Sequence, residues 1–210
     1  MTSITKLTEK YIDSHPSIKD CLKKDLINYS KLSRLIAEDF DEKNINFEAI
    51  LIASRRFQEK LKKSPILEDK IISFLKNSEL DIKNKVVVTI IDKLVYPGSL
   101  IDFEKEIKKN KDIFFSIEGT GGIILITSEK YLPKLKKLFK SSIIKIRQNL
   151  VMIIIKCSKE LENTPGISAF LYSKFGENGV NIVETMSCWT DNIFIIDEKD
   201  LTRTMEFLKF

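Results

Sequence analysis

The residues best suited to bind a small molecule form the run Asn163-Thr164-Pro165-Gly166-Ile167, between an apolar strand pattern and a helical pattern. Pro165 fixes one backbone angle and Gly166 has no Cβ, so the backbone N–H groups of this turn can approach an anion closely. The N-terminus of the following helix also favours negative charge. A carboxylate such as that of a free amino acid fits this chemistry. The alternative is an ordinary turn that shapes the fold and binds nothing.

Groups for catalysis are scarce in this sequence. The single histidine, His15, precedes a proline, a position pushed out of the helical region, so we expect it to end a helix. Cys21, Cys157 and Cys188 lack C-x-x-C spacing, which indicates neither a disulfide framework nor a zinc site. The run GTGG at 119–122 lacks the Lys-Ser/Thr of a phosphate loop and lies between two strand patterns, so it predicts a hairpin. We therefore predict no enzyme activity, no cofactor and no metal site.

A second candidate site lies on a helical pattern at Phe47–Lys63. Five basic residues lie on or near its polar side: Arg55, Arg56, Lys60, Lys62 and Lys63. With the turn at Asp39–Asn46, this helix is typical of a helix-turn-helix that contacts DNA phosphates. Many regulatory proteins join a small helical domain of this kind to domains that sense an effector. Acidic residues at 38–42 and at Glu48 oppose that interpretation. A helical domain that dimerises or docks onto an enzyme is the alternative.

The overall composition indicates a folded protein. The chain has 210 residues, 43% of them hydrophobic and 31% charged, with a net charge of +5. The excess of basic residues lies in the middle, since residues 1–80, 81–148 and 149–210 carry net charges of +2, +6 and −3. No apolar run approaches the ~18–20 residues that span a bilayer, and the N-terminus does not resemble a signal peptide. We expect a cytoplasmic protein with no membrane partner.

Residues 1–80 are predicted to be helical. Apolar and small residues recur at helical spacing in two runs: Leu32, Leu35, Ile36 and Phe40, then Phe47, Ile50, Ser54, Phe57 and Leu61. Asn28 or Ser30 can cap the first of these helices, and Asn46 can cap the second. A last helix is predicted at Ile66–Lys76.

Residues 83–148 change to a strand pattern. Strands are predicted at Val86–Ile91, Ile113–Ile117, Ile123–Thr127 and Ser142–Ile146, with helical faces from Leu100 to Ile107 and from Tyr131 to Phe139. The order βαββαβ is that of the ferredoxin-like module, a four-stranded antiparallel sheet with two helices on one face.

Residues 149–210 repeat this order without a fourth strand. Strands are predicted at Leu150–Cys157, Val180–Cys188 and Asp191–Asp197, with helices around residues 167–175 and 201–208. The fourth strand is either missing or lent by the partner module. Because an open sheet edge needs a partner, we predict a homodimer or higher oligomer. The predicted class is α+β: a helical domain at 1–80 and two ferredoxin-like modules at 83–148 and 149–210.

Several spaced elements of the last segment carry a resemblance. They are the turn at 163–167, the run Gly179-Val180-Asn181-Ile182, and a strand that ends in Asp197-Glu198-Lys199-Asp200. This pattern resembles the ACT domain family and is similar, more narrowly, to the regulatory domains of aspartate kinase. Over 83–148, only the order of elements and Tyr96-Pro97-Gly98 support a second ACT module. Residues 1–80 do not resemble the catalytic domain of that kinase, so the chain looks like a regulatory half without its enzyme.

The resemblance implies an amino-acid effector bound between the turn and the second strand of a neighbouring module. The implied ligand-binding residues are Asn163, Thr164, Pro165, Gly166, Ile167, Asn181, Ile182 and Val183. Glu184 or Asp191 would pair with the ammonium group of the ligand. We therefore expect a non-catalytic, amino-acid-sensing, allosteric regulatory protein. It would be a transcriptional regulator if the N-terminal helices bind DNA, or an accessory subunit of an amino-acid biosynthetic enzyme such as aspartate kinase if they dock onto protein.

Overall fold

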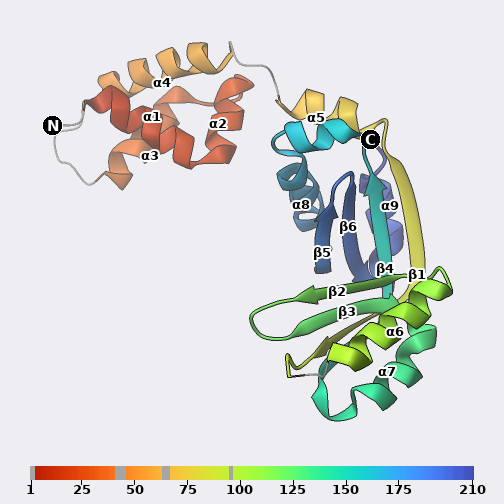
Figure 1. The fold of residues 1–210 in the computed structure, drawn as a ribbon. Helices are drawn as coiled ribbons and strands as arrows, with labels where there is room; N and C mark the ends of the chain where they lie inside the picture. The colour runs from red at the N-terminus through yellow and green to blue at the C-terminus, as the bar shows by residue number, and fades with distance from the viewer. Residues whose placement is uncertain (1–2, 41–45, 63–66, 95–96) are drawn as a thin grey trace. The chain divides into compact units, whose positions relative to one another are not determined.

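The computed structural model describes residues 3–40, 46–62, 67–94 and 97–210, and the chain divides into two compact units, residues 1–66 and 67–210 (Figure 1). The first unit is helical and the second contains one antiparallel sheet, so the protein is of the predicted α+β class. Within the described ranges, no helix is both long enough and apolar enough to cross a membrane.

The helical unit contains α1 (Ile4–Ser14), α2 (Pro16–Lys23), α3 (Tyr29–Asp39) and α4 (Phe47–Lys62). Polar side chains cap three of these helices as their residue types favour. The hydroxyl of Ser3 accepts from the N–H of Lys6, and the amide oxygens of Asn28 and Asn46 accept from N–H groups at the starts of α3 and α4. His15 ends α1, as predicted. The predicted turn between α3 and α4 falls largely on residues 41–45, which lie outside the described residues.

Apolar residues at helical spacing form the core of the helical unit. The buried members are Tyr11, Ile12, Leu22, Leu32, Ile36, Ile50, Phe57 and Leu61. Leu35 is an exception to the predicted run, because 43% of it is exposed. Ser54 is fully buried in its place on α4.

The second unit begins with α5 (Leu67–Leu75), the helix predicted at Ile66–Lys76. The elements that follow it are β1 (Glu79–Ile91), α6 (Pro97–Lys109), β2 (Phe114–Glu118), β3 (Ile123–Ser128), α7 (Leu132–Leu138), β4 (Ile143–Lys156), α8 (Ile167–Glu177), β5 (Ile182–Cys188), β6 (Asp191–Asp197) and α9 (Leu201–Phe207). The sheet order is β2-β3-β1-β4-β6-β5, and each neighbouring pair is antiparallel. The loop at 119–122 is the predicted hairpin, closed by a hydrogen bond from Gly119 N–H to the Gly122 carbonyl.

Two long strands, β1 and β4, run through the middle of this sheet. The sequence predicted only the second part of β1, and it divided β4 into two strands. Both predictions were wrong, because each strand continues through a bend. Lys85 on β1 has φ 53° and Asn149 on β4 has φ 55°, and the pairing of β1 with β4 shifts register near Lys83–Val88. These irregularities curl the sheet without interrupting either strand.

The bend divides the sheet into two halves that share β1 and β4. In the first half, the second part of β1 pairs with β3 and with the start of β4. In the second half, Glu79–Lys83 of β1 pairs with Met152–Lys156 of β4, which pairs in turn with β6. The pattern of residues 149–210 predicted three strands and left the fourth open. The first part of β1 is that fourth strand of the second half. Each half has the strand order of a ferredoxin-like sheet.

Helices cover one face of each half of the sheet. Alternation along β4 directs Val151, Ile153 and Ile155 toward a core that includes residues of α5 and α8, whereas Leu150 and Met152 face the other side of the sheet. The first half buries Phe103 of α6 and Leu135 of α7 in the same way. Although the sequence grouped α5 with the helices before it, Ile71 and Leu75 place it in the core of the second half.

Candidate functional site

The turn before α8 has a backbone that favours glycine. Gly166 adopts φ 91° and ψ −10°, in the left-handed region, and its carbonyl accepts a 2.9 Å hydrogen bond from the N–H of Phe170. No side chain caps this helix, which begins at Ile167. The first N–H groups of α8 therefore remain available to an anion in front of the turn.

A cleft of about 500 Å³ lies against this turn. Its lining comes from the turn region with the start of α8, and from the β5–β6 hairpin: Leu161, Glu162, Thr164, Pro165, Gly166, Ile167, Ser168, Ala169, Ser187, Trp189 and Asn192. The volume suits a small metabolite. Glu162 contributes the carboxylate of this lining, and Trp189 contributes the aromatic ring.

Trp189 lies at the tip of the hairpin with φ 53°, an uncommon conformation for an aromatic residue. Its side chain is 60% exposed, and the ammonium of Lys159 lies 5.4 Å from the ring centroid. This cation–π contact joins the hairpin to the segment that precedes the turn. The hairpin wall of the cleft is thus held to the segment that leads into the other wall.

Ser187 on β5 and Asn192 on β6 are direct cross-strand partners in the same lining. Behind Asn192, its Nδ2 donates to the Sγ of Cys157 at 4.0 Å. Burial raises the pKa of the Cys157 thiol. A thiol with a raised pKa is a poor nucleophile near neutral pH, so this cysteine acts here as a small half-buried side chain.

The predicted ligand-binding residues separate into two groups in the structure. Thr164–Ile167 line the cleft, and the exposed Asn163 directly precedes them. Asn181, Ile182 and Val183 lie at the opposite end of β5, about 20 Å from Cys188 at ~3.3 Å per residue. Within one chain, these two groups do not form a common site.

The two predicted partners for a ligand ammonium also lie outside the cleft. The hydroxyl of Thr190 donates to Asp191 at 3.2 Å. Glu184 lines a separate cavity of about 70 Å³ with Lys145 and Arg147, on the face of the sheet opposite α8. Burial raises the pKa of Glu184, although the positive charge of Arg147 opposes this rise. Arg147 itself donates to both carboxylate oxygens of Asp197 at 3.2 Å.

The basic residues of α4 are exposed, and most contact other groups of the helical unit. Lys60 pairs with Glu9, and the guanidinium of Arg55 lies 5.4 Å from the ring centroid of Tyr29. Arg56 is exposed, and Lys63 lies outside the described residues. Intramolecular ion pairing reduces the positive charge available to phosphates.

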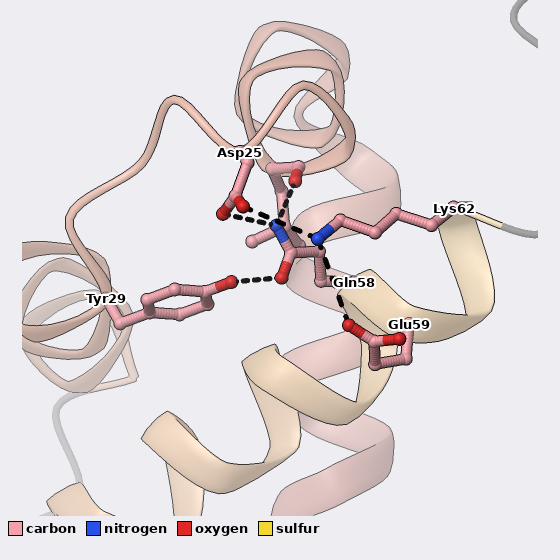
Figure 2. Close-up of polar contacts among 6 residues, drawn as sticks. Asp25, Tyr29, Gln58, Glu59 and Lys62 are labelled. Atoms are coloured by element: carbon pink, nitrogen blue, oxygen red, sulfur yellow. Dashed lines mark hydrogen bonds and ion pairs between the residues drawn. The ribbon is translucent and has the colours of Figure 1, made fainter.

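Lys62 belongs to a polar network centred on Gln58, which is 4% exposed (Figure 2). The Gln58 amide nitrogen donates to Asp25 at 2.8 Å and to the Leu22 carbonyl at 2.9 Å, while its oxygen accepts from the hydroxyl of Tyr29. Lys62 lies 3.4 Å from Asp25. The bond from Gln58, followed by the charge of Lys62, lowers the pKa of Asp25. Lys62 thus helps to hold the α2–α3 connection against α4.

Sequence reasoning missed the second wall of the cleft. Ser187, Trp189 and Asn192 belong to a predicted hairpin, but no spacing rule relates them to a turn more than twenty residues earlier. One signal was present, because Asn192 interrupts the apolar face of a strand that is otherwise buried. Glu162 was also missed, although it lies only two residues before Thr164.

The sequence matches no protein-family model and no curated protein. Solved structures are similar in fold. The regulatory subunit of aspartate kinase from Thermus thermophilus, in a ligand-free form, matches 63% of this chain over 94% of its own length, with 12% identity and a TM-score of 0.50. Aspartate kinase from Synechocystis matches with 16% identity and a TM-score of 0.51, over 63% of this chain and 26% of that one.

Aspartate kinase from Clostridium acetobutylicum gives a similar match, with 15% identity, a TM-score of 0.51 and 62% of this chain covered. This chain spans about a third of the length of that enzyme. At such low identities, the likeness concerns the fold. The resemblance to the regulatory domains of aspartate kinase, first indicated by the residues around the turn and β5, is therefore confirmed as a likeness of fold.

Proposed function

We propose that this protein is a non-catalytic regulatory protein that senses a free amino acid and acts as an accessory subunit of an amino-acid biosynthetic enzyme such as aspartate kinase. The observation that supports it most is the cleft against the left-handed Gly166 turn, on a fold similar to a regulatory subunit of that enzyme. The Clostridium acetobutylicum aspartate kinase is described as allosteric, and an effector site suits that kind of control.

The chemistry of the cleft matches the three parts of an amino acid. The ligand carboxylate would accept from the free N–H groups at the start of α8. The ammonium would pair with Glu162, and the side chain would lie between the turn and the hairpin that carries Trp189. The proposal assigns the ammonium to Glu162, because Glu184 and Asp191 lie elsewhere.

A second copy of the chain would complete the site. β5 is an edge strand, and antiparallel pairing of two β5 strands about Thr185 would place Ile182 of the second copy opposite Cys188. Asn181–Val183 of that copy would then lie beside the cleft of the first. This arrangement brings together the two groups of predicted ligand-binding residues, with each half of the sheet acting as one ACT-like module.

We assign the helical unit to docking on the client enzyme. The predicted helix-turn-helix and transcriptional role form the second candidate, supported by exposed Arg55 and Arg56 on α4. The pairing of Lys60 with Glu9 and of Lys62 with Asp25 favours docking, because DNA would have to compete with these carboxylates.

The proposal is tested with the full-length protein and the aspartate kinase of the same organism. Calorimetry against the common amino acids at millimolar concentration should give heat with at least one of them. That amino acid should then change kinase activity only when this protein is present. No heat with any amino acid would contradict sensing, whereas binding without any effect on the kinase would contradict the choice of client enzyme.

A gel shift with the DNA upstream of the gene separates the two roles of the helical unit. A DNA-binding α4 predicts a shift that weakens steeply with salt and with the double substitution Arg55→Ala, Arg56→Ala. The docking role predicts no shift, with or without the amino acid, and weaker kinase binding by the double variant. A salt-sensitive shift would transfer the proposal to transcriptional regulation.

A further inference from the structure

Asn192 is a polar residue on an apolar face of the sheet. Along β6, Asn192, Phe194 and Ile196 alternate toward the side covered by α8, and all three are buried. Asn192 is only 4% exposed, and its direct partner on β4 is Ile155, which is fully buried. A hydrophobic residue would continue this core, so packing alone does not account for a carboxamide at this position.

The hydrogen bonding of this carboxamide is incomplete. Its Nδ2 donates to the Sγ of Cys157 at 4.0 Å, which is the long limit for a weak acceptor. No described residue donates to its Oδ1. This oxygen is not among the fully buried polar atoms that lack a partner, so it is open to the cleft that Asn192 lines, where water or a ligand can donate to it.

The side chain of Asn192 also lines the cleft, beside Ser187 and opposite the turn at Gly166. In the proposed mode, the N–H groups of α8 bind the ligand carboxylate and the exposed Glu162 binds its ammonium. The group of the ligand left to approach Asn192 is then its side chain. The Oδ1 of Asn192 is then the acceptor available to that side chain.

We infer that Oδ1 of Asn192 accepts a hydrogen bond from the side chain of the bound amino acid, so the cleft selects amino acids whose side chain carries a hydrogen-bond donor. This inference rests on the proposed sensing function and adds a specificity-determining residue to it. A ligand that displaces water from this acceptor without donating to it leaves the acceptor unpaired, so the cleft should favour donor-bearing side chains.

The test uses the full-length protein and three matched pairs of probes: L-serine with L-alanine, L-threonine with L-valine, and L-lysine with L-norleucine. Calorimetry should show that the wild-type protein prefers the donor-bearing member of at least one pair by tenfold or more. In Asn192→Leu this preference should fall to less than threefold. The control is Thr204→Val on α9, where a buried hydroxyl donates to the Asp200 carbonyl outside the cleft, and it should keep the preference.

Thermal unfolding without ligand gives a second readout. Asn192→Leu places an apolar side chain on the face that carries Ile155 and Phe194, so its Tm should equal or exceed that of the wild type, whereas Thr204→Val should lower the Tm. A similar fall in both variants would show that the fold itself requires Asn192, and it would overturn the inference. Equal binding within every pair, or a preference that survives in Asn192→Leu, would also overturn it while leaving sensing intact. Binding of no amino acid at all would overturn the proposed function as well.

Discussion

The two halves of the sheet have the same strand order but differ in what surrounds a glycine that each of them needs. In the second half, the β5–β6 hairpin and the turn at Gly166 leave an open cleft with Asn192 in its lining. In the first half, the loop before β3 lies close to the end of β1 at Gly122. A Cβ on Gly122 would lie 2.7 Å from the carbonyl oxygen of Ile91, and the buried residue that starts β3 is the apolar Ile123.

This difference separates a structural role for glycine from a functional one. Gly122 is required because two backbone segments of the first half come close together. Gly166 borders the cleft of the second half, and it is required because of its left-handed backbone. One glycine thus allows close strand packing, whereas the other shapes the candidate site.

The largest expected effect comes from Gly166→Val. A β-branched residue at φ 91° strains the turn by about 1–3 kcal/mol and withdraws its N–H groups from the ligand, so amino-acid affinity should fall at least about a hundredfold while the unit remains folded. Calorimetry measures the affinity and circular dichroism checks the fold. Gly176→Ala on α8 is the matched control, because its Cβ meets no atom within 4 Å. It should leave affinity unchanged and add about 0.5–1 kcal/mol of stability.

The next effect concerns Gly122 in the first half and is an effect on stability. Gly122→Ala should lower the free energy of unfolding by about 1–3 kcal/mol, because its Cβ meets the backbone of β1 and a backbone cannot move aside as a side chain can. Urea unfolding measures this loss. Gly121→Ala in the same loop has open space around it and should cost far less. Equal stability of the two variants would mean that the backbone near Ile91 accommodates a Cβ on Gly122.

The sequence could predict the elements of both halves better than the candidate site. Local patterns predicted both hairpins, the helices and the residues of the turn, because these depend on neighbours in the chain. The continuity of β4 was hidden by the polar run Arg147-Gln148-Asn149, which looks like a break until Asn149 is seen in a left-handed bend. The first part of β1 was hidden in the same way, because its charged residues alternate with Leu80 and Ile82.

The cleft itself depends on register and on contacts distant in the sequence. Asn192 can line it because it pairs with Ser187 on one side and with Ile155 on the other. A shift of one residue in either pairing would direct its side chain to the opposite face. The sequence alone does not determine that register, and so it predicted the turn without its facing wall.

A smaller effect distinguishes the two edges of the sheet. If β5 pairs with its own copy about Thr185, Thr185→Asp places two like charges opposite each other and should weaken dimerisation about tenfold. Ser116→Asp changes the central residue of the other edge strand, β2, and should leave the dimer intact. Light scattering across a concentration series measures both midpoints. Equal weakening of dimerisation by the two variants would show that β5 is not the specific dimer interface.

The smallest expected effect is the pH dependence of stability that Glu184 causes. This residue lies in the second half, on the face of the sheet opposite α8. Burial raises the pKa of this carboxyl above its ordinary value of 4.5, so the native state favours the protonated form. The stability that protonation contributes is fully present below pH 4.5 and is lost as the pH rises through the higher native pKa. Glu184→Gln stays neutral, so this variant should gain stability relative to the wild type at pH 7 and lose that advantage at pH 4. Urea unfolding of both proteins at the two pH values measures the difference. The opposite result is a Glu184→Gln variant that is less stable than the wild type at pH 7 and loses this disadvantage at pH 4. It would mean that the charge of Arg147 outweighs burial at this position.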